Sequence, residues 1–278
     1  MSNSEQIQKA RVFRALHARS GAFIIPNPWD AGTARLLTAA GFEALATTSA
    51  GLAYALGRRD GAATRTETLA NARDIVQATH LPVAADLENG FGDSPEMVAE
   101  TIRMAAAVGL VGGSIEDATG NADTPIYDFD ASVKRVEAAM EAARGLDFPF
   151  TLAARAENFL HGRVDLHDTI RRLQAFEKAG ADVLFAPGLP DLDAIRKVCA
   201  AVSRPVNVVS GTAYTLTQLA EVGVKRVSTG SALARASLSA VAHAAEEMKE
   251  LGSFNFAKNT ITFAKANELM TTNKLSSF

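Results

Sequence analysis

KAGADVLF, at residues 178–185, joins the end of a helical segment to the start of a short apolar strand through a single glycine. AAGFEAL (39–45) and AAVGLVGG (106–113) repeat this arrangement. A glycine directly after a helix favours a left-handed C-cap, and short turns from helix to strand are what a tightly wound parallel sheet requires. The three segments therefore predict a series of strand and helix units along the chain.

Short apolar runs rich in Val, Ile, Ala and Phe alternate with segments of helical period from about residue 22 to about residue 250. We expect strands near 22–26, 43–48, 82–86, 110–115, 149–154, 182–186, 205–209 and 224–228. We expect helix starts at residues whose side chains can cap free backbone amides, namely Asp30, Thr66, Ser94, Asp128, Asp165, Asp191 and Thr215. This alternation predicts an α/β fold, the (β/α)8 TIM barrel.

The competing architecture is a doubly wound sheet. It usually carries a G-x-G-x-x-G turn after its first strand, whereas this chain has Pro26-Asn27-Pro28-Trp29-Asp30 there. No linker or change of composition divides the chain, so we expect one barrel domain over 1–278, with the barrel over about 22–250. A further C-terminal helix over about 254–272 exceeds what eight units need, and we expect it to pack on a neighbouring subunit.

Composition narrows the class of partner. Lys and Arg number 28 against 31 Asp and Glu, a formal net charge of -3, and no basic stripe with interleaved aromatic residues is present. We therefore expect no nucleic acid as a partner. No apolar run approaches the ~18 residues that span a bilayer, so we expect no membrane segment and a cytoplasmic protein. The near-neutral charge favours a small-molecule partner. Cys199 is the single cysteine, which excludes a disulfide framework and a zinc site.

Acidic residues gather where the predicted strands end, the face on which barrels of this type build their active sites. They are Asp60, Asp86, Glu88, Glu116 and Asp117. An isolated D-x-E is usually a cap or a solvated loop, but several carboxylates at one rim favour a binding site. Oxygen-only ligands suit Mg²⁺ or Mn²⁺, which keep several waters, so some of these carboxylates would act through water.

Two further features lie at strand ends. Arg155 either pairs with Glu157 or Glu116, or binds a substrate carboxylate through two parallel hydrogen bonds, and we favour the second role. The turn Thr47-Thr48-Ser49-Ala50-Gly51 is either small-residue packing or a set of hydroxyl and amide groups that surround a carboxylate. Position alone leaves these two interpretations of the turn open.

A resemblance follows from the order of the motifs IPNPWDAGTARLLTAAGF, TTSAGLA, GRRD, DLENGFG, SIED and ARAE. Between about Phe23 and Ala232 the chain resembles the isocitrate lyase and phosphoenolpyruvate mutase superfamily. The resemblance implies a magnesium site, a homo-tetramer or dimer with swapped C-terminal helices, and roles for particular residues. Asp60, Asp86, Glu88 and Glu116 match the acidic magnesium cluster, Ser49 and Gly51 the carboxylate-binding turn, and Arg155 the substrate arginine.

The chain departs from the superfamily pattern at two places. Glu88 stands where many relatives have an Asp, which keeps the charge and lengthens the reach. Lyases of the superfamily carry a Lys-Lys-Cys-Gly-His loop after the fourth strand, whereas ATGNADTPIYDFD at 118–130 has no Lys, Cys or His. Retro-aldol cleavage needs an acid for the departing carbanion, but loss of CO₂ does not. The altered loop therefore favours decarboxylation, unless water or Tyr127 supplies the proton.

These features predict a Mg²⁺-dependent carbon–carbon lyase or decarboxylase acting on an oxaloacetate-like 2-oxo acid through a metal-stabilised enolate. The candidate catalytic residues are Asp60, Glu116 and Arg155, and the candidate substrate-binding residues are Ser49, Ala50, Gly51, Asp86, Asn121 and Arg155. One alternative is a phosphonomutase or phosphonopyruvate hydrolase, in which Asn121 and Thr124 lie near a transferring phosphoryl group. Another is a 2-oxo acid binding protein without catalysis.

Overall fold

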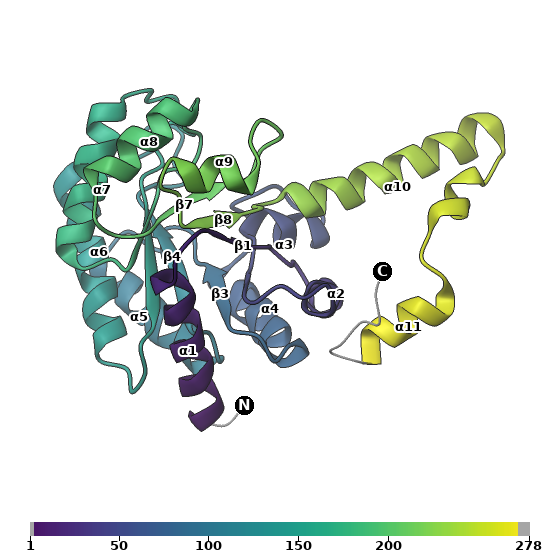
Figure 1. The fold of residues 1–278 in the computed structure, drawn as a ribbon, viewed down its shortest axis with the longest axis horizontal. Coiled ribbons are helices and arrows are strands. Elements are labelled where there is room, and N and C mark those ends of the chain that lie inside the picture. The colour runs from purple at the N-terminus through teal and green to yellow at the C-terminus, as the bar shows by residue number, and fades with distance from the viewer. Residues whose placement is uncertain (1–2, 272–278) are drawn as a thin grey trace.

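The computed structural model describes residues 3–271, and these form an eight-stranded parallel barrel surrounded by helices (Figure 1). The strands are β1 (Phe23–Ile25), β2 (Leu45–Ala46), β3 (Val83–Asp86), β4 (Gly112–Glu116), β5 (Thr151–Arg155), β6 (Val183–Phe185), β7 (Val206–Val209) and β8 (Arg226–Ser228). Their order is β1-β8-β7-β6-β5-β4-β3-β2, and the amide of Ala46 donates to the carbonyl of Pro26 (3.1 Å) between β2 and β1. The predicted (β/α)8 TIM barrel and all eight predicted strands are confirmed.

Helices follow the strands and cover the outside of the barrel (Figure 1). Their bounds are α1 (Asn3–Ala18), α2 (Ala31–Ala39), α3 (Ser49–Ala55), α4 (Arg65–Ala78), α5 (Pro95–Ala107), α6 (Phe129–Arg144), α7 (Leu166–Ala179), α8 (Leu192–Ala201), α9 (Leu216–Glu221), α10 (Ala232–Leu251) and α11 (Phe263–Thr271), with a short 3-10 helix η1 (Asn255–Asn259) between the last two. Buried apolar side chains such as Val98, Ile102 and Leu152 fill the layer between helices and strands.

The helix ends follow the predicted chemistry with one correction. Gly41, Gly109 and Gly180 take left-handed φ angles of 88°, 99° and 107° at the predicted turns. Six of the seven predicted caps are confirmed, but the cap of α4 is Thr64 and not Thr66. Thr64 and Glu67 form a reciprocal capping box, in which each side chain satisfies a backbone amide at the start of the helix.

The parallel arrangement brings the carboxyl ends of all strands to one rim. Asp86, Glu116 and Arg155 are the last residues of β3, β4 and β5. In the strand register Glu116 lies beside Arg155, and Asp86 lies beside Ser114 of β4. Side chains two residues apart on one strand face the same side, so the residues at these ends share a single rim.

Helix α1 closes the opposite end of the barrel and was not predicted from the sequence. Its Ala10, Phe13 and Leu16 are buried in one apolar cluster, together with Phe23, Ala44, Ala84 and Val111 near the starts of β1 to β4. Gly112 makes room for this helix, because a side chain there would meet the ring of Phe13 and the carbonyl of Thr151. The amphipathic signal of α1 is weak in the sequence, and contacts with the barrel stabilise it.

The C-terminal segment leaves the barrel and returns. In Figure 1, α10 extends away from the barrel and α11 comes back to lie near α2. Leu269 of α11 is fully buried. The C-terminal helix predicted over 254–272 covers only Phe263–Thr271, since η1 and an extended turn precede it and residue 272 lies outside the described residues. None of the described helices is long and apolar enough to cross a membrane.

His17, on α1, predicts a measurable pH dependence of stability. Burial, and next the charge of Arg226, lower the pKa of His17 to about 3. The unfolded chain binds a proton near pH 6.5, so acid favours unfolding between pH 6.5 and 3, by up to about 1.4 kcal/mol per pH unit. We expect the free energy of unfolding, measured by urea denaturation from pH 7.5 to 4, to fall more steeply in the natural protein than in His17→Gln. Parallel curves would show that folding does not restrict protonation of His17.

Candidate functional site

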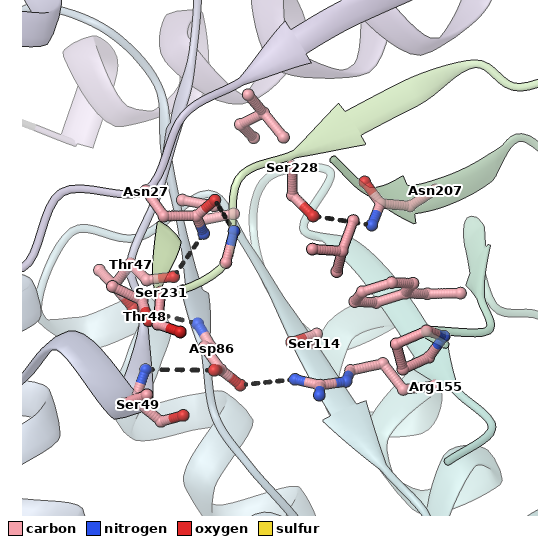
Figure 2. A pocket seen from close by; sticks show the side chains of 18 of the residues that line it. Asn27, Thr47, Thr48, Ser49, Asp86, Ser114, Arg155, Asn207, Ser228 and Ser231 are labelled. Carbon is pink, nitrogen blue, oxygen red and sulfur yellow. Dashed lines mark hydrogen bonds and ion pairs between the residues drawn. The ribbon is translucent and has the colours of Figure 1, made fainter. Parts of the chain in front are cut away.

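A cavity of about 300 Å³ opens at the carboxyl ends of the strands (Figure 2). Its walls include Asn27, Ser49, Asp86, Arg155 and Asn207, which come from the strand ends and the loops that follow them. This volume is at the lower end of the range for small-molecule sites. The cavity therefore suits a compact ligand of a few carbon atoms.

Arg155 is the centre of an ion-pair network in this cavity. Its guanidinium contacts Asp86 at 2.9 Å, Glu116 at 3.1 Å and Glu157 at 2.8 Å, and it lies over the ring of Phe185 with 5.1 Å to the ring centroid. Burial alone would lower the pKa of Arg155, but the three carboxylates outweigh it and hold the pKa well above its usual range. Arg155 is therefore permanently charged, and its position is held by several partners.

Asp86 connects the second and third strand ends (Figure 2). One carboxylate oxygen accepts from the amide of Ser49 (3.2 Å), while the amide of Asp86 donates to the hydroxyl of Thr47 (3.1 Å). The hydroxyl of Ser49 donates to Asp60 at 3.3 Å. The structure thus brings Ser49, Asp60 and Asp86 together, although they lie on three separate segments of the chain.

The predicted carboxylate-binding turn divides into two parts. Ser49 and Ala50 line the cavity. Gly51 does not line it: the amide of Gly51 donates to the hydroxyl of the cap residue Thr48 (3.2 Å), and an added Cβ would lie 2.9 Å from Cβ of Trp29. Gly51 is therefore placed for close packing of α3 rather than for direct contact with a ligand in the cavity.

Glu88 and Glu116 lie in a part of the site where the negative charges outnumber the positive charges. Burial, followed by the charges of Asp86 and Asp60, raises the pKa of Glu88 to about 7. Burial also raises the pKa of Glu116 well above its usual range, and Arg155 only partly offsets this. The Oε1 atom of Glu88 is buried and has no hydrogen-bond partner. Glu88 also takes a left-handed φ of 48°, which is unusual for a residue with a side chain.

These features fit a hydrated divalent cation better than a cage of protein ligands. Within residues 3–271, no group of three or more His, Cys, Asp or Glu side chains is arranged so that it could hold a metal ion. A cation near Asp86 would relieve the excess charge and give the unpaired oxygen of Glu88 a partner. Mg²⁺ commonly takes one or two carboxylates and keeps several waters. Asp60, Glu88 and Glu116 would then act mostly through such waters.

Two buried arginines support the loops around the site. Arg172 pairs with Asp117 at 3.0 Å, and Asp117 in turn accepts from the amide of Glu157 (2.8 Å). Asp117, from the same SIED motif as Glu116, therefore connects the ends of β4 and β5. Arg135 donates to the carbonyls of Asn89, Gly92 and Asp93, which holds the loop that follows Glu88.

The loop at 118–130 lies outside the central cavity. Asn121 is exposed, and with Thr124 and Tyr127 it lines a separate outer pocket. The hydroxyl of Tyr127 donates to Asp93 (2.5 Å), and burial followed by this contact raises the pKa of Tyr127 to about 12. The structure therefore places Asn121 and Tyr127 at the outer pocket, and neither contacts Arg155 or Asp86.

Three polar residues of the cavity were missed by sequence reasoning: Asn27, Asn207 and Arg226. Asn27 accepts from the amides of Thr229 (2.8 Å) and Gly230 (3.0 Å), which joins the ends of β1 and β8. The sequence feature that could have indicated such residues is a polar residue inside an otherwise apolar strand, as in VNVV at 206–209. Such a residue points either inward or outward, and the sequence alone does not tell which.

The fold and the site define a TIM-barrel protein with a cluster of carboxylates and one arginine at the carboxyl ends of its strands. The model of the family described as phosphoenolpyruvate phosphomutase matches residues 13–249. The chain belongs to this family, within the isocitrate lyase and phosphoenolpyruvate mutase superfamily. The resemblance predicted from the motifs is confirmed.

Individual relatives carry several activities. A solved structure of a candidate lyase or mutase from Burkholderia cenocepacia J2315 is 58% identical, covers 98% of this chain and 99% of that chain, and superposes with a TM-score of 0.96. The 2-methylisocitrate lyase of Escherichia coli K12 is 30% identical over 70% of this chain and 68% of its own length. The oxaloacetate decarboxylase of Chromohalobacter salexigens is 27% identical, over 90% of this chain and 89% of its own length.

The Glu88→Gln variant should distinguish a role of Glu88 in cation binding from a role in stabilising the fold. Removing a buried negative charge from a cluster of like charges should raise the free energy of unfolding of the metal-free protein, on the order of 1 kcal/mol. The same change should weaken binding of Mn²⁺, used as a probe, by about tenfold or more. Glu137→Gln, at an exposed position of α6, is the matched control for loss of a glutamate charge. Lower stability with unchanged Mn²⁺ affinity would assign Glu88 a purely structural role.

Proposed function

We propose that this protein is a Mg²⁺-dependent carbon–carbon lyase or decarboxylase that acts on a small, oxaloacetate-like 2-oxo acid. One observation carries the proposal: Arg155 and Asp86 line a small cavity, and their ion-pair network extends to Glu116 behind it. Two residues after Asp86, Glu88 has a buried oxygen without a hydrogen-bond partner. The guanidinium of Arg155 provides a site for an anionic substrate. The acidic cluster, whose negative charge is only partly neutralised, provides a site for a divalent cation. Membership of a superfamily with lyases and a decarboxylase supports the same reaction class.

In this proposal the cationic side chain binds the substrate, and the acidic side chains bind the metal ion. The planar fork of Arg155 suits two parallel hydrogen bonds to the substrate carboxylate. Ala50 lies in the first turn of α3, where backbone amides lack helical partners, so its N–H is available to the same carboxylate. Asp86, with Glu88, Glu116 and Asp60 around it, would hold the cation. Bound Mg²⁺ would supply positive charge to the oxygen of the enolate that forms when the carbon–carbon bond breaks.

The contacts of Tyr127 favour decarboxylation over retro-aldol cleavage. Retro-aldol cleavage needs an acid that protonates the departing carbanion. In decarboxylation CO₂ leaves without an acid, and the enolate that remains can take its proton from water to give pyruvate. The hydroxyl proton of Tyr127 is directed to Asp93, and Tyr127 lines the outer pocket rather than the central cavity. No other tyrosine, and no histidine, lysine or cysteine of the described chain, lines that cavity.

The proposal is tested by release of pyruvate from oxaloacetate with Mg²⁺ present. Free Mg²⁺ itself speeds this decarboxylation, so the blank is Asp86→Ala at equal protein and metal concentration. We expect the natural protein to exceed the blank by at least about a hundredfold, because the variant loses a carboxylate that lines the cavity and pairs with Arg155. Circular dichroism and thermal unfolding of the variant establish that its fold is retained.

Release of pyruvate equal to the blank would contradict the proposal. Phosphonopyruvate, assayed in parallel for phosphate release and for conversion to phosphoenolpyruvate, would then distinguish carbon–phosphorus chemistry from binding alone. Turnover of phosphonopyruvate would support the mutase or hydrolase alternative. Binding of 2-oxo acids with no turnover of either substrate would support a binding protein.

Association through the C-terminal segment is a separate proposal. Along α10 and the residues after it, apolar side chains are strongly exposed in the single chain, including Val241 (67%), Leu251 (75%) and Phe263 (85%). A swapped dimer or tetramer would cover them. We expect Val241→Asp to lower the molar mass measured by sedimentation equilibrium, while Val164→Asp, at an exposed valine beside the barrel rim (74%), leaves it unchanged. A monomeric natural protein, or equal masses in all three, would oppose this assembly.

A further inference from the structure

We propose that the inner part of the cavity contains a second anion subsite, formed by Arg226, Asn207 and Ser228, which binds the far carboxylate of a dicarboxylic substrate. This inference deepens the proposed function and rests on it for the position of the first carboxylate at Arg155. It adds a specificity determinant on the opposite wall of the same cavity, contributed by β7 and β8.

The strand register places the subsite below the rim. Ser228 ends β8, and Arg226, two residues earlier, faces the same side about 7 Å deeper along the strand. Asn207 of β7 lies beside Arg226 in the register. All three line the same cavity as Asp86 and Arg155. In Figure 2, Asn207 and Ser228 lie above the Asp86 and Arg155 pair, joined by the 3.1 Å hydrogen bond from the amide of Asn207.

Arg226 is a buried cation without a counter-charge. It is only 7% exposed, and among the described residues no Asp or Glu lies within ion-pair distance of it. Burial lowers the pKa of Arg226 to about 10, so it stays charged at neutral pH. A buried charge without a counter-charge is unfavourable in the protein interior, in contrast with Arg155, which has three carboxylates. An anionic ligand would remove this cost.

The protein partners of Arg226 are neutral acceptors. Its Nε donates to the side-chain oxygen of Asn207 (2.8 Å), and its Nη1 lies 3.3 Å from Nε2 of His17. His17 directs its other ring nitrogen to the carbonyl of Phe13 (2.8 Å), so Nδ1 carries the proton and Nε2 accepts. These contacts use two of the donors and orient the guanidinium. No described residue accepts from Nη2.

The surroundings favour a carboxylate over a phosphonate. Arg155 and Arg226 are the cations among the described residues that line the cavity. One guanidinium at each end matches one negative charge at each end, whereas a doubly charged phosphonate at Arg226 would be half neutralised. The same cavity is lined by small side chains, including Ala46, Ala84 and Ser114.

A contact with Arg226 should affect binding more than turnover. If the far carboxylate leaves as CO₂, its negative charge disappears in the transition state, so Arg226 stabilises the bound substrate more than the reacting one. In the decarboxylation assay, Arg226→Gln should therefore raise KM for oxaloacetate without lowering kcat to the same degree. A purely structural role would not produce this split.

The direct test compares two non-reacting ligands by calorimetry with Mg²⁺ present. Malate has a carboxylate where 2-hydroxybutyrate has a methyl group. We expect the natural protein to bind malate about ten to a hundred times more tightly, the effect of one charged hydrogen-bonded contact. Arg226→Gln should remove most of this preference while leaving the affinity for 2-hydroxybutyrate nearly unchanged. Arg204→Gln, at an exposed arginine away from the cavity, is the matched control and should keep the preference.

Arg226→Lys is the second variant, used in case Arg226→Gln does not fold. It keeps the positive charge and loses only the planar guanidinium. We expect it to retain part of the preference for malate. Equal affinity of the natural protein for the two ligands would overturn the subsite, as would an undiminished preference in a folded Arg226→Gln. Because neither ligand reacts, these results do not depend on whether oxaloacetate is decarboxylated, and failure of the proposed function remains distinguishable.

Discussion

The ion pairs of Arg155 with Asp86, Glu116 and Glu157 are the interaction on which the rest of the site depends. They connect the ends of three consecutive strands, and they do so with one cation against three anions. The parallel barrel makes this possible, because it places the last residues of β3, β4 and β5 side by side at one rim. These side chains belong to segments far apart in the sequence, and only the folded sheet brings them into contact.

The resulting excess of negative charge is costly for the fold and useful for binding. Glu88 and Glu116 both have raised pKa values, chiefly because of burial, and one oxygen of Glu88 has no partner. A site in this condition is expected where function competes with stability. Behind it, Arg172 and Arg135 hold the neighbouring loops through buried contacts, so the acidic cluster is displayed by a rigid frame.

The opposite wall has the reverse imbalance. Arg226 is a buried cation whose protein contacts, Asn207 and His17, are neutral. Both walls contribute residues to one cavity, and the proposed dicarboxylic substrate rests on this arrangement. Helix α1, which closes the opposite end of the barrel, takes part in this arrangement, because its His17 contacts the guanidinium of Arg226. A residue from the closed end of the barrel therefore contacts a residue that lines the cavity.

The sequence by itself determined the elements that depend on local pattern. The alternation of apolar runs with helical segments located all eight strands, glycine located the turns, and the motif order located the acidic strand ends and Arg155. The prediction was wrong at the start of α4, where two threonines lie two residues apart. Thr64, and not Thr66, caps the helix, because Glu67 forms a capping box with Thr64.

Only the tertiary structure decided which polar residues face inward together. Asn27, Asn207 and Arg226 sit in segments whose sequence is compatible with either face, and closure of the barrel places them in the cavity. The same closure leaves Asn121 on an outer loop, although the sequence had suggested it as a substrate contact. Strand and helix follow from the periodicity of nearby residues, whereas a site is made by residues far apart in the chain, which meet only when the whole barrel has closed.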